Sequence, residues 1–269
     1  MEPIGEEPAG QSLVDNRKKT KEQIVDDLYK GTGGFGCFQV FMMFVVQCQM
    51  SSIAFWWNSL GFYIQQPKYV CEFNTPVKDP DDVCTAKNIC DHDPRIKTSY
   101  IDWDDQKSLH NWIERLDMQC MPDWQVGLLG SAFWIGFITT MLWIPRISDV
   151  RGRKNLFRVG CVLSALLYLV LVFSKNYYVT IAGIFGFGVT NTIRTIIGFV
   201  YMTELMPKSS QKVAVTIFWI IDGCVYLVCV IYFWKISDKC QYLISFGCCF
   251  MCLAALLCWF LPESPVYLI

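Results

Sequence analysis

The sequence predicts an all-α membrane protein with six transmembrane helices in one bundle and a large extracellular loop between the first two helices. Two observations predict this fold class. The 269-residue chain is 53% hydrophobic and only 17% charged, which is less charge than a soluble domain of this length carries on its surface. Its apolar residues also gather into stretches of about 20 residues, the length that a helix needs to cross a hydrocarbon layer of about 30 Å.

Six apolar stretches are the predicted transmembrane helices, and the polar sequence between them defines the other regions. The predicted helices cover residues 35–57, 125–145, 156–174, 179–203, 213–234 and 241–261. Trp56 and Trp57 close the first helix, where an interfacial belt of aromatic residues is expected. The chain then divides into a cytoplasmic segment at 1–34, the first helix at 35–57, an extracellular loop at 58–123, five further helices within 124–261 and a cytoplasmic end at 262–269.

The orientation of the chain follows from the basic residues of its short loops. The loop between the second and third predicted helices carries five bases and one acid, namely Arg146, Asp149, Arg151, Arg153, Lys154 and Arg158. Because basic loops stay on the cytoplasmic side of a membrane, we expect both chain ends in the cytoplasm and residues 58–123 outside. A plasma-membrane location is expected, with an internal membrane as the alternative.

Cysteine usage supports an extracellular position for the polar loop. Of the 14 cysteines, nine lie within predicted helices, where cysteine packs as a small apolar residue. Four share the loop, namely Cys71, Cys84, Cys90 and Cys120. An even number in one loop predicts two disulfides in an oxidising compartment, and three pairings remain open.

Two charged residues lie deep inside predicted helices, where burial is costly unless the charge is paired or hydrated. Arg194 lies in the fourth helix and Asp222 in the fifth, both about 15–20 Å from the cytoplasmic end at about 1.5 Å per residue. We expect adjacent antiparallel helices to bring them together in a substrate cavity, where a bound ion competes for one partner. A structural ion pair that holds the two helices together is an equally supported alternative.

Aromatic and polar residues accompany these charges at helical spacing. Trp219, Asp222 and Tyr226 share one face, and an acid flanked by aromatic rings suits an organic cation through charge and cation–π attraction. Asn191 likewise shares a face with Arg194. In the first helix, two glutamines face either a hydrated cavity or a neighbouring helix, and packing is favoured. The predicted cavity residues are Gln39, Gln47, Asn191, Arg194, Trp219, Asp222 and Tyr226.

The loop from Ile147 to Lys154 predicts a latch on the cytoplasmic side. Asp149 is placed to accept hydrogen bonds at a helix N-terminus, while the bases after it are placed to pair with acids on other helices. Such a latch holds one state of a transporter and releases it in another. The alternative is that these charges only set the orientation of the chain.

Several stretches, taken in order, resemble the major facilitator superfamily and, within it, the organic cation, anion and carnitine transporter family. Residues 145–154 resemble the loop signature of the superfamily, with Pro145 and Val150 where that signature has glycine and arginine. Residues 24–39 resemble the family's entry into its first helix, and the cysteine-bearing loop resembles its extracellular domain. Residues 262–265 resemble its motif after the sixth helix.

The resemblance implies that this chain is the amino-terminal six-helix half of a twelve-helix fold, whose substrate binds between two halves. A second six-helix half or a homodimer is therefore a possible partner. The gating residues that the resemblance implies are Asp149, Gly152, Arg153, Lys154, Glu204, Pro262, Glu263, Ser264 and Pro265.

The sequence therefore favours transport of small organic ions by a secondary carrier, with this chain as a fragment or half-transporter in the lipid bilayer. The alternatives are a non-transporting membrane subunit or scaffold, and an extracellular binding module on a membrane anchor. A net charge of −1 argues against nucleic acid. Residues 31–36 fit G-x-G-x-x-G but lack the preceding strand of a nucleotide site. No enzyme activity, cofactor or metal is expected.

Overall fold

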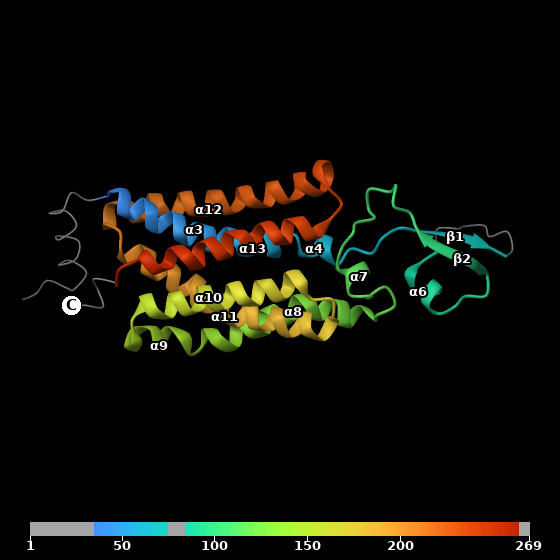
Figure 1. Cartoon of the computed structure of the whole chain (residues 1–269), viewed down its shortest axis with the longest axis horizontal. Helices are drawn as coiled ribbons and strands as arrows, with labels where there is room; N and C mark the ends of the chain where they lie inside the picture. The colour runs from blue at the N-terminus through green and yellow to red at the C-terminus, as the bar shows by residue number, and fades with distance from the viewer. Residues whose placement is uncertain (1–34, 75–83, 264–269) are drawn as a thin grey trace, which may run out of the picture.

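Long helices lie side by side in one elongated bundle, with a small module at one end (Figure 1). The structure is a computed structural model and describes residues 35–74 and 84–263. The predicted cytoplasmic segment at 1–34 lies outside the described residues, as do Ser264 and Pro265. The bundle elements are α3 (Cys37–Trp57), α8 (Asp123–Met141), α9 (Ile144–Arg151), α10 (Arg153–Phe173), α11 (Tyr177–Glu204), α12 (Lys208–Ile231), the π-helical turn η1 (Tyr232–Ile236), α13 (Cys240–Leu257) and the 3₁₀ turn η2 (Cys258–Phe260).

Five helical segments of the described chain are long and apolar enough to cross a membrane. They are Cys37–Trp57, Arg153–Phe173, Tyr177–Glu204, Lys208–Ile236 and Cys240–Phe260. The predicted second transmembrane helix at 125–145 coincides with α8, which ends at Met141 and is not among the five. Polar residues such as Gln125, Thr139 and Thr140 lower the mean hydropathy of α8. The structure therefore shows an all-helical membrane bundle, and the count of six spans stays a prediction.

Glycines allow the helix backbones of the bundle to approach closely. A Cβ atom added at Gly136 of α8 would overlap the carbonyl oxygen of Phe185, and one added at Gly188 of α11 would overlap that of Phe133. The two helices therefore cross with their backbones in contact, as small residues permit in membrane bundles. Since α11 also packs against α10 and α3, it is the central helix of one side of the bundle.

The residues between α3 and α8 form the disulfide module, which comprises residues 58–122 as far as they are described. Its elements are α4 (Leu60–Tyr63), β1 (Tyr69–Phe73), α6 (Ala86–Cys90), β2 (Ile96–Ile101) and α7 (Trp112–Arg115). The two strands pair antiparallel, with Cys71 opposite Ser99. Figure 1 shows β1, β2 and α6 beyond the end of the bundle, with α4 and α7 next to it.

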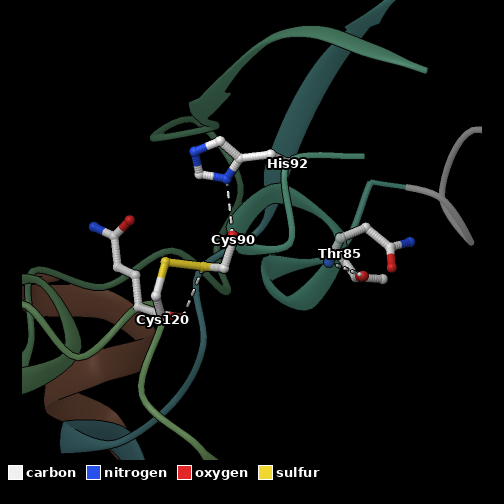
Figure 2. Close-up of a disulfide and its surroundings, with 6 residues drawn as sticks. Thr85, Cys90, His92 and Cys120 are labelled. Carbon is white, nitrogen blue, oxygen red and sulfur yellow. Dashed lines mark hydrogen bonds between the residues drawn. A yellow bond between two sulfur atoms is a disulfide. The ribbon is translucent and has the colours of Figure 1, made fainter. Parts of the chain in front are cut away.

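Two disulfides close the module and select one of the three pairings that the sequence left open. Cys71 bonds to Cys84 and Cys90 bonds to Cys120, with Cα–Cα distances of 5.7 and 5.5 Å. Figure 2 shows the second disulfide at the end of α6, where Nδ1 of His92 lies 2.9 Å from the carbonyl oxygen of Cys90. The same view shows Thr85, whose hydroxyl accepts a hydrogen bond from the backbone of Asn88 and caps α6.

Hydrogen bonds attach the disulfide module to the bundle. The guanidinium of Arg115 donates to Gln241 and to the carbonyl oxygen of Val172. The module is therefore fastened to the end of α10 and the start of α13. Within the module, the side-chain amide of Asn111 donates to the carbonyl oxygens of Phe62 at 3.0 Å and Gln65 at 2.7 Å.

Candidate functional site

Arg194 lies in the centre of α11 and is completely buried. Its Nη1 donates to the backbone carbonyl of Gln49 at 2.9 Å and to the side-chain Oε1 of Gln49 at 3.0 Å. The guanidinium carbon also lies 4.7 Å from the ring centroid of Phe187. Gln49 is fully buried on α3, so these contacts hold α3 against α11. Arg194 was predicted from its charge within an apolar helix, whereas Gln49 was not predicted, because it does not share the helical face of Gln39 and Gln47.

Several buried polar atoms around Arg194 have no hydrogen-bond partner in the described chain. They are Nε and Nη2 of Arg194, Nε2 of Gln49 and Oγ of Ser164 on α10. No carboxylate of the described residues forms an ion pair with Arg194. A buried charge without a counter-charge is destabilising, and the guanidinium retains two nitrogens, with three N–H bonds between them, able to donate to an acceptor.

Asp222 does not meet Arg194, contrary to the expectation that adjacent helices bring them together. The helix that carries it, α12, packs mainly against α3, whereas α11 packs against α8 and α10. Val225 and Cys229 of α12 are buried in one cluster with Ala54 and Phe55 of α3. The prediction that the fourth and fifth helices bring Arg194 and Asp222 together was therefore wrong. The order of helices around a bundle is set by side-chain packing and not by chain order.

The exposed side of α12 carries the predicted aromatic and acidic face. Asp222 is half-buried, while Trp219 and Tyr226 are 55% and 51% exposed. The spacing of these three residues places them on one helix face, beside the seam that α12 forms with α3. Of the five segments that are apolar enough to cross a membrane, the one that contains α12 is the least covered by the rest of the chain. In its apolar 18-residue stretch 22% of the residues are buried, against 44% to 61% in the other four segments.

The remaining predicted cavity residues form hydrogen bonds within their own helices. Oε1 of Gln39 accepts the backbone N–H of Gly36 at 2.9 Å and so caps the start of α3. Nε2 of Gln47 donates to the hydroxyl of Ser51 at 3.3 Å. Asn191 is buried, and its Oδ1 accepts the hydroxyl hydrogen bond of Thr195 at 2.8 Å. Each bond involves one polar atom of its side chain, so a place for these three residues in a substrate cavity stays a prediction.

A second group of predicted residues does come together at the end of the bundle that is opposite the disulfide module. We name this group the charge cluster, and its members are Arg153, Lys154, Glu204 and Glu263. Arg153 at the start of α10 forms an ion pair with Glu204 at the end of α11. The backbone N–H of Lys154 donates to the carboxylate of Glu263 at 3.2 Å, which places a negative charge at the N-terminus of α10.

Arg158 and Tyr201, neither of which was predicted as a gating residue, extend the charge cluster. Arg158 donates to the carbonyl oxygens of Cys258 at 3.1 Å and Leu261 at 3.3 Å, which follow the end of α13. The hydroxyl of Tyr201 donates to the carbonyl oxygen of Pro262. Because an arginine satisfies free carbonyl groups at a helix end, Arg158 fastens α13 to α10 and is more than a charge that sets orientation.

Gly152 shapes the turn that presents the charge cluster. It connects α9 to α10 with φ of 86° and ψ of 150°, a conformation that side-chain-bearing residues rarely adopt. The predicted glycine turn is therefore present where the loop signature places it. The side chain of Asp149, the acid of the same motif, lies outside the described part of the structure.

Comparison with known proteins identifies a family profile that spans the described bundle and relatives that match about half of the chain. Residues 31–269 match the profile of the family described as "Sugar (and other) transporter". A synaptic vesicle 2-related protein from Bos taurus is 29% identical over 150 residues, which cover 55% of this chain and 27% of that protein. The human organic cation/carnitine transporter 2 is 28% identical over 162 residues, which cover 57% of this chain and 28% of that protein. The matched part thus spans less than a third of these relatives.

Proposed function

This chain belongs to the sugar (and other) transporter family of the major facilitator superfamily, and we propose that it is one half of a secondary carrier of small organic ions. One observation carries the proposal. Asp222 lies half-buried between the exposed rings of Trp219 and Tyr226 on the least covered membrane helix. A carboxylate on a lipid-facing surface is costly, whereas a carboxylate between two halves of a carrier contacts substrate and water.

The chemistry of this face favours an organic cation as the substrate. The carboxylate supplies the opposite charge, and the two aromatic rings attract a cation that also has apolar groups. The name of the relative organic cation/carnitine transporter 2 is consistent with this substrate class.

The charge cluster supports a gating role at the opposite end of the bundle from the disulfide module. It joins the start of α10 to the ends of α11 and α13 through Arg153, Glu204 and Glu263. Breaking these contacts releases three helix ends at once, which is what a latch between two states of a carrier requires. We place this end in the cytoplasm and residues 58–123 outside, in the plasma membrane or an internal membrane.

A second half has to cover the exposed side of α12. A second copy of this chain, related by a two-fold axis along the membrane normal, supplies such a half in the same way as a different six-helix chain. The alternative function is a non-transporting membrane subunit. Val150 favours it, because this residue stands where the loop signature of the superfamily has a basic residue.

The proposal is tested by uptake and by binding of an organic cation. The full chain in native membranes is expected to take up tetraethylammonium saturably, and Asp222→Asn is expected to abolish uptake without loss of folded protein. Asp91→Asn is the matched control, because it removes an exposed carboxylate of the disulfide module. If the wild-type chain shows neither uptake nor binding that depends on Asp222, the carrier proposal is wrong and the subunit is favoured.

A further inference from the structure

A cavity of about 620 Å³ lies where the disulfide module meets the end of α12. One wall comes from the module between Trp103 and Leu109, and the other comes from Val230 to Asp238 at the end of α12 and in η1. Phe62 of α4 and Gln65 complete the lining. We name it the junction cavity, and none of the residues predicted for the substrate cavity lines it.

The two walls of the junction cavity are fastened to each other. The rings of Phe62 and Phe233 stack with their centroids 4.5 Å apart. The backbone N–H of His110 donates to the carbonyl oxygen of Asp238 at 3.0 Å, and that of Cys240 donates to the carbonyl oxygen of His110 at 3.1 Å. A ligand therefore meets a largely preformed site, which lowers the entropic cost of binding.

Charge in the junction cavity favours a cation. Asp104, Asp105 and Asp238 line it, against a single lysine, Lys235. Asp105 accepts the backbone N–H of Lys107 at 2.8 Å and pairs with Lys68 at 3.2 Å, and these contacts lower the pKa of its carboxyl group.

Two of these carboxylates remain available to a ligand. Asp238 lies 3.7 Å from Nε2 of His110, beyond hydrogen-bond distance, and this contact is an ion pair only when the imidazole is protonated. Asp104 is exposed and forms no ion pair with any residue that the structure describes. A cation in the junction cavity therefore meets carboxylates that the chain itself has not neutralised.

Aromatic faces in the junction cavity already hold a cation from the chain itself. The Nζ atom of Lys235 lies 4.2 Å from the ring centroid of Trp234, which is 65% exposed. Trp103 on the opposite wall is 41% exposed, and one of its faces stacks on His110 with ring centroids 4.1 Å apart. The ammonium over Trp234 is direct evidence, independent of the acids, that this surface accepts a positive charge.

From this geometry we propose that the junction cavity binds a trimethylammonium group, which displaces the Lys235 ammonium from Trp234 and is neutralised by Asp104. Such a group carries its charge inside an apolar surface, so it gains from aromatic faces more than a strongly hydrated inorganic ion does. A metal ion is disfavoured, because the described residues contain no group of three or more His, Cys, Asp or Glu side chains that could hold one.

Two sources supply a trimethylammonium group at this position, a soluble quaternary ammonium compound and the headgroup of phosphatidylcholine. Binding itself does not depend on the carrier function proposed above. A role in collecting cations before transport does rest on that function, and the experiment therefore separates the junction cavity from Asp222.

The test is calorimetric titration of choline into the full chain in nanodiscs of phosphatidylglycerol, which has no choline headgroup. Trp103→Leu and Asp104→Asn are expected to weaken binding about 3-fold to 30-fold, the range of a cation–π or charge contact at such a site. Lys235→Met is expected to strengthen it, since the competing ammonium is removed. Glu72→Gln is the control, as it removes an exposed carboxylate of the same module outside the cavity.

Further titrations identify the chemistry and the source of the ligand. The uncharged isostere 3,3-dimethylbutanol is expected not to bind. A lower apparent affinity for choline in phosphatidylcholine nanodiscs assigns the cavity to the lipid headgroup, and an unchanged affinity assigns it to the soluble cation. Thermal unfolding of each variant verifies that Trp103→Leu is folded.

The Asp222→Asn variant separates this inference from the carrier proposal. If it abolishes choline binding while Asp104→Asn and Trp103→Leu leave binding intact, the junction cavity is not the site and the carrier proposal stands. If binding survives Asp222→Asn and falls in the cavity variants, the junction cavity is supported whether or not uptake is found. Equal binding of the uncharged isostere would overturn the inference.

Discussion

At the scale of single residues, Arg194 places a positive charge inside the bundle with Gln49 as its hydrogen-bond partner and Phe187 as its ring contact. The charge has no carboxylate partner among the described residues, and two of its nitrogens, Nε and Nη2, have no acceptor there. Such an arrangement contributes little stability by itself, since the cost of burial offsets the bonds that are formed. A functional reason for the residue is therefore favoured over a structural one.

Replacing Arg194 tests this assignment. In Arg194→Met, removal of the buried charge offsets the lost bonds to Gln49, so the free energy of unfolding is expected to change by less than about 2 kcal/mol. Uptake of organic ions is expected to fall. Thermal unfolding in detergent and uptake in membranes measure the two effects, with Lys175→Met as the control for an exposed charge. A variant that no longer folds would show that Arg194 serves structure.

The pair of Asp93 and Arg95 predicts a pH dependence of the disulfide module. The guanidinium donates to both carboxylate oxygens, at 3.0 Å from Nε to Oδ1 and 2.6 Å from Nη2 to Oδ2. These bonds lower the pKa of Asp93 to about 2. Because the folded pKa lies below the ordinary value of about 4, the pair stabilises the fold above that value, and the contribution disappears as the pH falls toward 2.

The corresponding measurement is thermal unfolding of the full chain between pH 6 and pH 2, for the wild type and for Asp93→Asn. The wild type is expected to be the more stable protein at pH 6, and the difference is expected to shrink below pH 4. A difference that does not change with pH would mean that the carboxylate of Asp93 does not contribute through its charge.

At the scale of helices, the crossing of α8 and α11 depends on glycine. A methyl group at Gly136 meets the backbone of Phe185, which cannot move aside as a side chain can. Gly136→Ala is therefore expected to destabilise the bundle by about 1–3 kcal/mol or to separate the two helices. Gly127→Ala in the same helix is the matched control, because nothing lies within 4 Å of the added atom. If thermal unfolding shows that Gly136→Ala and Gly127→Ala are equally stable, the close crossing of α8 and α11 at Gly136 is contradicted.

The charge cluster shows why helix ends were easier to predict than helix neighbours. Arg153 and Glu204 were predicted as gating residues from a family signature, and the structure pairs them. The bond from Tyr201 to Pro262 was not predicted, because a tyrosine in an apolar helix has no pattern that distinguishes it from a core residue. A charge inside or beside a membrane requires a partner, whereas a hydroxyl at the edge of the bundle does not.

At the scale of the whole molecule, the bundle is unevenly covered. In the segment that contains α12, 22% of the residues of the apolar 18-residue stretch are buried, against 61% in the segment that forms α3. We expect the chain in mild detergent to have the mass of a homodimer or of a complex with a second membrane chain. Native mass spectrometry and cross-linking from α12 measure this. A monomer without a partner that still shows uptake dependent on Asp222 would contradict the half-carrier arrangement.

The sequence by itself determined the properties that depend on composition and local pattern. These are the membrane class, the helix positions, the glycine turn at Gly152, the two disulfides in the polar loop and the family. Each depends on residues close together in the chain, or on hydrophobicity summed over a helix, so no knowledge of packing was required.

Only the tertiary structure decided which distant residues meet. It paired Cys71 with Cys84 and Cys90 with Cys120, gave Arg194 the partner Gln49 in place of Asp222, and formed the junction cavity between the disulfide module and η1. The physical reason is that similar apolar helices can be arranged around a bundle in several orders. Shape complementarity between side chains, which is not visible in a periodic pattern, selects one of them.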